Sequence, residues 1–298
     1  MSKTLKLEIL QATGNQKKRY IKNKIFQIFV VVFAIIATTP VFFILFELIK
    51  KGIKQINFDF FTKVAPDSFE AMMAVSSGKG IPGGILNGIG GTLIMVTVAS
   101  IVAIPLGLLI GIFLYENGKS RYANIVRDVS DILQGAPSIV LGIISYIWIV
   151  KNVTHGFSAL AGSMALAIMM LPLIIRSTEE TFKMIPNSIK EAGLALGIPY
   201  HKILLKILIP TGLSGLLTGI LLAISRVIGE TAPLMLTALG NPTLSFNLNK
   251  PVDAVPLLIW QFYNDPNLVD LVWSSSLFLV FLVLVLNLIS KRIISKRK

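Results

Sequence analysis

Two opposite charges lie in an otherwise apolar stretch of the C-terminal half, Arg226 and Glu230, in the segment SRVIGETAP. Each ionised side chain costs roughly 2.5 to 3.5 kcal/mol at the centre of a membrane helix, so such residues usually face a bundle interior or a water-filled path. On a helix, residues four apart share one face. An arginine stays charged at physiological pH and can donate two parallel hydrogen bonds to an oxyanion. The segment therefore predicts a polar, anion-binding site, with Ser225 and Thr231 beside the two charges.

The alternative to a functional role is a structural one, in which Arg226 and Glu230 neutralise each other or bridge to another subunit. Pro233 has no amide hydrogen for the Gly229 carbonyl, so it should kink the helix and open a cavity beside the charges. Our hypothesis is that the Glu230 carboxylate offsets Arg226 and keeps an anion from binding too tightly to leave.

A second informative stretch is the polar segment Glu191 to Pro210, EAGLALGIPYHKILLKILIP. Ser188 and Glu191 have the spacing of a capping box, and Gly197 fits a left-handed helix stop with a proline two residues beyond. These signals predict a helix of about two turns. The face predicted to dock carries Ile189, Ala192, Gly193 and Leu196. A helix this short needs packing to be stable, and its support could come from its own bundle or from a partner.

A third group of charges follows an apolar run: Arg176, Glu179 and Glu180. They could form a polar gate at the end of a membrane span. Ordinary ion pairing on a helix surface is the alternative.

Composition determines the environment of these groups. The chain of 298 residues is 54% hydrophobic and 14% charged, with a mean hydropathy of +0.76. These values predict an all-α polytopic membrane protein. Runs long enough to cross roughly 30 Å of hydrocarbon predict six transmembrane helices, at about 25–49, 92–114, 132–150, 156–175, 212–239 and 269–290. No cleavage pattern follows the first run, which is therefore expected to be an uncleaved anchor.

The distribution of Lys and Arg predicts the orientation, since cytoplasmic loops retain positive charge. Twenty lie in 1–24, 115–131, 176–206 and 291–298, whereas seven lie in the connections on the other side. Both basic tails, 1–24 and 291–298, and the coupling segment 176–210 are therefore expected in the cytoplasm. The loop 50–85 is expected outside. This asymmetry accounts for most of the net charge of +13, and it argues against nucleic-acid binding.

The sequence contains no soluble catalytic or cofactor motif. Cysteine is absent, and His155 and His201 are expected on opposite sides of the membrane, so neither a thiolate site nor a shared histidine metal site is predicted. Gly118, Lys119 and Ser120 resemble the end of a phosphate-binding loop, but Phe113 stands where its first glycine is required. We therefore expect a non-enzymatic chain without a cofactor, metal or ATP site of its own.

The segment from Glu191 resembles the EAA loop of the membrane permeases of bacterial ABC importers. That loop reads EAA, three residues, G, nine residues, I, one residue, LP. The matching positions here are Glu191, Ala192, Gly193, Gly197, Ile207, Ile209 and Pro210. RVIGETAPLMLTALGN, from Arg226 to Asn241, is similar to the phosphate-specific permeases in which APL follows GET. PGGILNGIGGT, IPLGLLIGIFLYE, LQGAPSIVLG and LPLIIRSTEE also resemble that type.

The resemblance implies a type I ABC importer permease fold, with its core in 86–290, in the bacterial inner membrane. It implies that Ser188 to Gly197 docks on an ATPase dimer that binds ATP. A homologous permease and an extracytoplasmic phosphate-binding protein would complete the phosphate importer. Two alternatives remain open: a permease for another oxyanion such as sulfate, and an ATP-independent anion transporter or channel.

Overall fold

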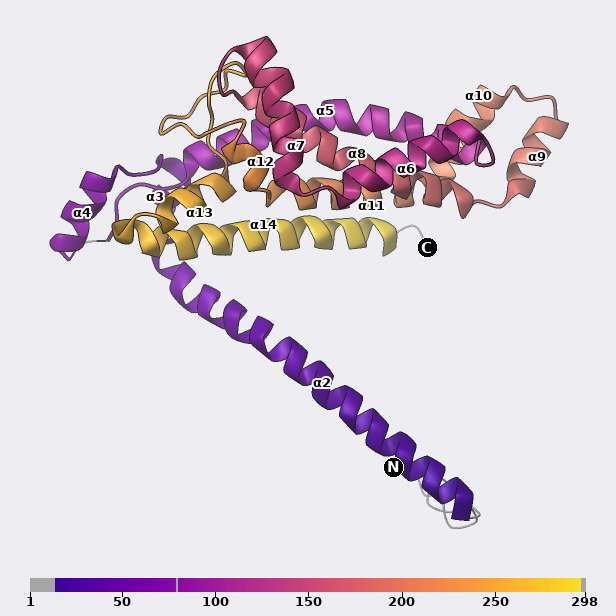
Figure 1. The fold of residues 1–298 in the computed structure, drawn as a ribbon, viewed down its shortest axis with the longest axis horizontal. Coiled ribbons are helices and arrows are strands. Elements are labelled where there is room, and N and C mark those ends of the chain that lie inside the picture. The colour runs from indigo at the N-terminus through magenta and orange to yellow at the C-terminus, as the bar shows by residue number, and fades with distance from the viewer. Residues whose placement is uncertain (1–13, 79, 296–298) are drawn as a thin grey trace. The chain divides into compact units, whose positions relative to one another are not determined.

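We analysed a computed structural model that describes residues 14–78 and 80–295 (Figure 1). These residues form helices and loops. The β pairing among the described residues is one isolated bridge between Leu239 and Val252. The expected basic tails lie partly outside the description, at residues 1–13 and 296–298. The chain divides into two units, Met1–Lys51 and Gly52–Lys298.

The first unit contains most of helix α2 (Gly14–Gly52), whose 39 residues are apolar over most of their length. At 1.5 Å per residue the helix is about 58 Å long, which is more than a bilayer core requires. Its large Ile, Val and Phe side chains are largely exposed, as expected for a helix that meets lipid.

The second unit holds the remaining spans. Leu86–Glu116, Ala159–Lys183, Tyr200–Ile228 and Pro266–Arg292 are each long and apolar enough to cross a membrane, as is α2. A bent pair of helices, Arg121–Gly135 with Ser138–Thr154, makes a sixth candidate span. The predicted all-α polytopic membrane fold is confirmed.

The third span differs from the single apolar span predicted over 132–150. Helix α6 (Arg121–Gly135) and helix α7 (Ser138–Ser145), which continues as a π-helix over Tyr146–Thr154, meet at an angle of 106°. Pro137 has no amide hydrogen, and its ring pushes Ala136 out of the helical region. Ala136 accordingly has extended backbone angles of φ −68° and ψ 138°.

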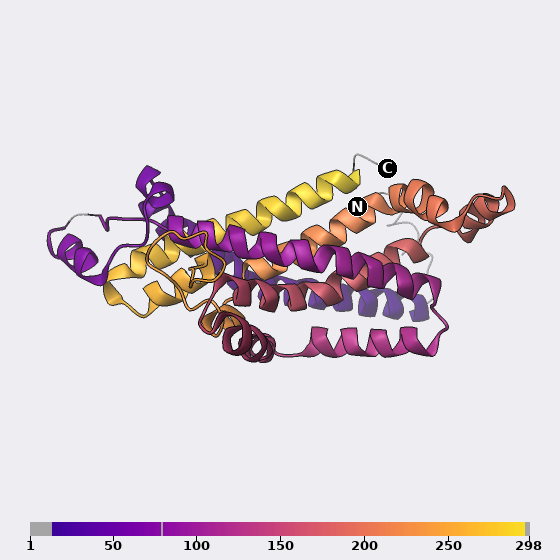
Figure 2. The same ribbon diagram turned by 90° about the horizontal axis from the view of Figure 1, so that it is seen from above.

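The centre of the second unit is a bundle in which α5 (Leu86–Glu116) lies against α8 (Ala159–Lys183). Helix α11 (Ile209–Ile228) packs on α8, and α14 (Val269–Ser295) packs on α11 (Figures 1 and 2). Glycines allow the closest approach: a methyl group at Gly111 would lie 2.5 Å from Thr178 Cβ, and one at Gly107 would lie 2.7 Å from Ile174 Cγ2. Such small residues are typical of membrane helix interfaces.

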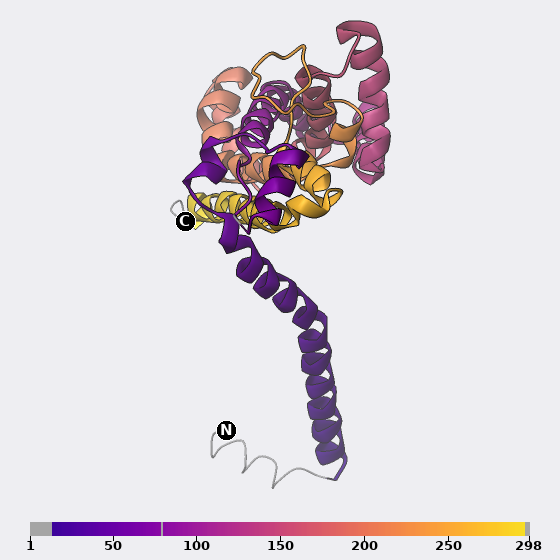
Figure 3. The same ribbon diagram turned by 90° about the vertical axis from the view of Figure 1, so that its left-hand side faces the viewer.

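The two ends of the bundle carry different structures. At one end lie α3 (Phe58–Thr62), α4 (Ser68–Ser76), α12 (Ala232–Met235) and α13 (Val255–Tyr263) (Figure 1), and this end faces the viewer in Figure 3. At the other end, α9 (Asn187–Ala195) and α10 (Tyr200–Ile203) project beyond the bundle (Figures 1 and 2). We call these the α13 end and the α9 end.

Candidate functional site

Helix α9 is the predicted docking helix, and its C-terminal stop is confirmed. Gly197 has φ +73°, a conformation that a glycine adopts without strain from a Cβ atom. Its amide donates to the Leu194 carbonyl at 2.9 Å, and the Ile198 amide donates to the Gly193 carbonyl at 3.2 Å. These two bonds are the pair that defines a Schellman motif.

The predicted capping box at the other end of α9 is wrong. The helix begins at Asn187, the cap residue is Pro186, and no side chain caps the helix. Pro186 has an extended ψ of 130°, so the turn into the helix is complete before Ser188, which then lies inside the first turn. The exposed Glu191 carboxylate is thus left available for a contact outside this chain.

The predicted docking face of α9 is divided between the bundle and the surface. Gly193 is buried against Ile203, where a methyl group would lie 2.9 Å from Ile203 Cδ1, and Ile189 packs on the same apolar cluster. Ala192 and Leu196 point outward, and Leu196 is 79% exposed. One side of α9 therefore rests on its own bundle, and the other presents an apolar surface.

A layer of ion pairs joins α6 to α8 near the α9 end. Arg127 Nη2 lies 2.7 Å from Glu179 Oε1, and Lys183 Nζ lies 2.6 Å from the same oxygen. Arg127 also donates to the backbone carbonyls of Gly118 and Leu114. The Glu179 side chain is only 8% exposed, so α6 and α8 are fastened by a nearly buried carboxylate with two cationic partners.

The other predicted gate residues form a separate, exposed set of contacts. Arg176 lies 3.2 Å from both Glu180 and Asp131. All three predicted residues line one pocket of about 220 Å³, but Arg176 pairs with Glu180 rather than with Glu179. Sequence reasoning missed Arg127 and Asp131, because they lie 52 and 45 residues from their partners and only the fold brings them together.

Arg226 and Glu230 do not share a helix face, contrary to the prediction. Helix α11 ends at Ile228, and Glu230 follows the cap residue Gly229. Pro233 lies in the first turn of the new helix α12 rather than in a kinked α11, because proline is suited to the start of a helix. The ion pairs found among the described residues do not include one between Arg226 and Glu230.

The surroundings of this break differ from one side chain to the next. Arg226 is exposed on the surface of this chain, Glu230 and Thr231 are half-buried, and Ser225 is buried with a hydroxyl that has no hydrogen-bond partner. A groove of about 490 Å³ runs from Gly229 along α14 to Asn287 and Lys291. Arg226 and Glu230 do not line this groove. The helix break thus leaves Gly229 exposed at the groove, and the Arg226 side chain faces outward.

The α13 end contains a buried polar network that the sequence did not indicate. Asp253 is 2% exposed and accepts hydrogen bonds from Asn87 Nδ2 at 2.9 Å, Gln261 Nε2 at 3.1 Å and the Asn241 amide at 3.2 Å. Burial raises the pKa of the Asp253 carboxyl to about 6, although the three hydrogen bonds act to lower it. The network joins the start of α5 to the loop before α13.

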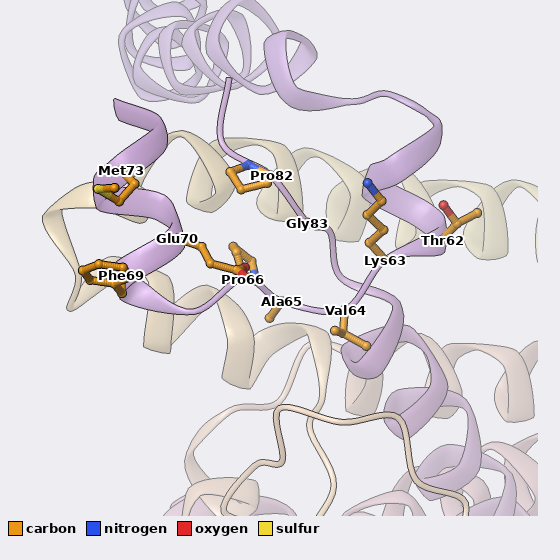
Figure 4. Close-up of a pocket in the computed structure, with 10 residues that line it drawn as sticks. All are labelled: Thr62, Lys63, Val64, Ala65, Pro66, Phe69, Glu70, Met73, Pro82 and Gly83. Atoms are coloured by element: carbon orange, nitrogen blue, oxygen red, sulfur yellow. The ribbon is translucent and has the colours of Figure 1, made fainter. Parts of the chain in front are cut away.

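The same end has a surface pocket of about 810 Å³ between α4 and the chain on either side of it. Figure 4 shows Phe69 and Met73 on α4 opposite Pro82 and Gly83, with Lys63 near the end of α3. Lys63 is already paired with Asp59 at 2.7 Å. Within residues 14–78 and 80–295, no group of three or more His, Cys, Asp or Glu side chains is placed to hold a metal ion.

The described residues form a polytopic bundle of apolar helices with a short helix projecting at one end. Residues 103–295, more than half of the chain, match the family described as binding-protein-dependent transport system inner membrane component. The chain belongs to this family.

Several similar proteins are named phosphate transport system permease protein PstA. The chain is 37% identical to the phosphate transport system permease protein PstA of Haemophilus influenzae over 258 residues, 86% of this chain and 87% of that protein. It is 38% identical to PstA of Yersinia pestis, over 86% of this chain and 84% of that protein. PstA of Mycobacterium leprae is 33% identical over 91% of this chain and 88% of that protein.

A solved structure supports the fold. The chain resembles an inward-facing structure of the MetNI methionine ABC transporter with a TM-score of 0.61 and 22% identity, over 71% of this chain and 94% of that chain. A second MetNI crystal form gives a TM-score of 0.56 at 21% identity. The predicted ABC importer permease fold is confirmed.

Proposed function

We propose that this chain is the permease subunit of an ATP-driven phosphate importer. The observation that carries the proposal is its identity of 37 to 38%, over more than four fifths of its length, to proteins named phosphate transport system permease. The segment GETAPL, in Glu230 to Leu234 and the preceding glycine, lies at the break between α11 and α12. This break is the feature most suited to line a substrate path.

We propose that the α9 end faces the cytoplasm. The connections that carry twenty of the 28 Lys and Arg residues lie on that side of the predicted spans, and cytoplasmic loops retain positive charge. Both termini then lie in the cytoplasm of a bacterial cell, and the α13 end lies outside the inner membrane.

In this orientation α9 is the part that a cytoplasmic ATPase dimer can reach. Its outward side offers Ala192, Leu194 and Leu196 together with the Glu191 carboxylate. Ser188 lies in the first turn of the helix, and Gly197 follows its last turn. An apolar patch with one charge at its edge is suited to a protein groove, because burial of the leucines provides affinity and the charge provides register. ATP would be bound by the ATPase, and this chain would supply no cofactor or catalytic group.

The substrate path is proposed to lie beside the outward-facing Arg226. An arginine that is exposed on an isolated membrane subunit needs a polar neighbour within the bilayer, and a homologous permease packed on this surface would close the path. Arg226 would then donate to phosphate oxygens, with Ser225, Glu230 and Thr231 nearby. An extracytoplasmic phosphate-binding protein would deliver the ion at the α13 end.

Uptake of labelled phosphate by the reconstituted complex tests the proposal. We expect ATP-dependent uptake that resists excess sulfate, and a loss of at least tenfold in Arg226→Ala. Arg121→Ala, at the exposed start of α6, is the matched control and should transport normally. Equal competition by sulfate would indicate another oxyanion permease, flux by this chain alone without ATP would indicate a channel or secondary transporter, and normal uptake by Arg226→Ala would refute the assigned path.

A further inference from the structure

The last residue of α5, Glu116, holds both arms of the α9–α10 hairpin. One carboxylate oxygen lies 2.5 Å from Lys190 Nζ on α9, and the other accepts a hydrogen bond of 2.5 Å from the Tyr200 hydroxyl at the start of α10. These partners lie 74 and 84 residues away in the sequence. One side chain therefore connects α5 to the two segments that flank the helix stop at Gly197.

The environment of this contact makes it stronger than a surface ion pair. The Lys190 and Glu116 side chains are 25% and 22% exposed. The Lys190 ammonium also lies 5.0 Å from the ring centroid of Tyr200 and 5.6 Å from that of Tyr115. Two aromatic faces shield the pair from water and attract the cation, so both the charge contact and the cation–π contacts gain from the reduced solvent screening.

Helix α9 has little else to hold it in place. Its nine residues are too few for a stable isolated helix, and its N-terminus has no side-chain cap. Gly193 and Ile189 give it an apolar contact with the bundle. In the described part of the chain, the pair with Glu116 is the side-chain ion pair that fixes its orientation on that contact.

We propose that Glu116 is a positioning residue that fastens the coupling helix α9 to α5. The inference rests on the proposed function, because it assigns to α5 the displacement that an ATPase would impose on α9. Helix α5 is suited to this role: its 31 residues span about 46 Å, and its far end is held by Asn87 in the buried Asp253 network. A movement of α9 would therefore reach the extracytoplasmic loops through one continuous helix.

Glu116→Gln is the informative substitution, since glutamine keeps the size of the side chain and an oxygen acceptor for Tyr200 but removes the charge that faces Lys190. Asp128→Asn is the matched control, because Asp128 is an exposed carboxylate on α6. Hydrogen exchange of the full chain in lipid nanodiscs measures the fastening without any partner. We expect α9 amides to exchange about tenfold faster in Glu116→Gln, since a charge-assisted hydrogen bond is lost, and to be unchanged in Asp128→Asn.

The assembled complex provides the second readout, the ratio of ATP hydrolysis with and without phosphate-loaded binding protein. We expect this ratio to fall at least threefold in Glu116→Gln while the ATPase still co-purifies with the permease. Lys190→Gln should give at least the same fall, and the double variant should be no worse than Lys190→Gln alone, because all three variants lack the contact between Glu116 and Lys190. If Glu116→Gln folds poorly, Lys190→Gln carries the test.

The two proposals fail in different ways. A wild-type complex without phosphate-stimulated hydrolysis would refute the importer function, whereas exchange by α9 could still report the fastening. A coupled wild type whose ratio is unchanged in both Glu116→Gln and Lys190→Gln would overturn the positioning role, as would unaltered exchange of α9. A fall in thermal stability with the ratio intact would show a purely structural contact and would also overturn it.

Discussion

Gly91 is the position where a single methyl group should do the most damage to the α13 end. A Cβ atom at this residue of α5 would lie 1.8 Å from the Asp253 carbonyl oxygen and 2.9 Å from its carbonyl carbon. Both neighbours are backbone atoms, so no side-chain rotation relieves the overlap. The helix and the loop must separate until the first distance reaches at least 3.0 Å.

That separation strains two hydrogen bonds that cross the same contact. Asn87 Nδ2 donates to Asp253 Oδ2 at 2.9 Å, and the Val255 amide donates to Thr92 Oγ1 at 3.0 Å. Overpacking costs about 1–3 kcal/mol, and each lost hydrogen bond costs about 0.5–1.5 kcal/mol. Replacing glycine by alanine in a helix returns about 1 kcal/mol. The net destabilisation expected for Gly91→Ala is about 1–5 kcal/mol.

Thermal unfolding in detergent measures this effect, followed as the fraction of monodisperse protein that remains after heating. Gly135→Ala is the control, since it also replaces a helical glycine but has no atom within 4 Å of the new methyl group. We expect the midpoint of Gly135→Ala to equal or exceed that of the wild type and the midpoint of Gly91→Ala to fall by several degrees. Equal midpoints for the two variants would refute the close approach of α5 to the loop.

Three further substitutions test other contacts. Glu179→Gln leaves Arg127 and Lys183 without their shared carboxylate, so we expect about 2 kcal/mol less stability and increased hydrogen exchange in α6; unchanged exchange would contradict the ion-pair layer. Asp253 has a pKa near 6 in the fold and an ordinary value of 3.8, so the unfolded chain loses its proton first as pH rises. The wild type should therefore lose up to about 3 kcal/mol of stability between pH 4 and pH 6 or slightly above, whereas Asp253→Asn should lack this dependence; parallel profiles by thermal unfolding would argue against it. Gly197→Ala places a side chain at φ +73° and should cost about 1–2 kcal/mol locally, seen as faster exchange in α9 with α8 unaffected.

Part of the site was predictable because its signals are local. A helix stop depends on one residue that accepts a positive φ, so Gly197 predicted the end of α9 correctly. The capping box failed for a local reason as well: Pro186 occupies the cap position, two residues before the expected cap Ser188, and Ser188 lies in the first turn. Pro186 and Ser188 are both possible cap residues, and only the backbone conformation shows that the helix begins after Pro186.

The break after Ile228 shows a different limit. Pro233 predicted a disturbance of the fifth span at the correct place, since a missing amide hydrogen disturbs the helix four residues earlier. Sequence could not choose between a kinked helix and two helices. Gly142 of α7 packs on Pro233, with a distance of 2.7 Å from the position of a Cβ to Pro233 Cα, so the choice depends on a contact between segments about ninety residues apart.

The sequence by itself determined the membrane environment, the helical class and the predicted orientation. The length of each apolar run and the number of Lys and Arg residues in each connection can be counted along the chain without its three-dimensional structure. It also determined two places where helices are interrupted, through Gly197 and Pro233, but it did not indicate the bend at Pro137. Tertiary structure alone decided which charged and polar side chains meet. Glu116 with Lys190, Glu179 with Arg127 and Asp253 with Asn87 are separated by 74, 52 and 166 residues, and charge–charge and hydrogen-bond energies depend on distances that only packing of the helices establishes.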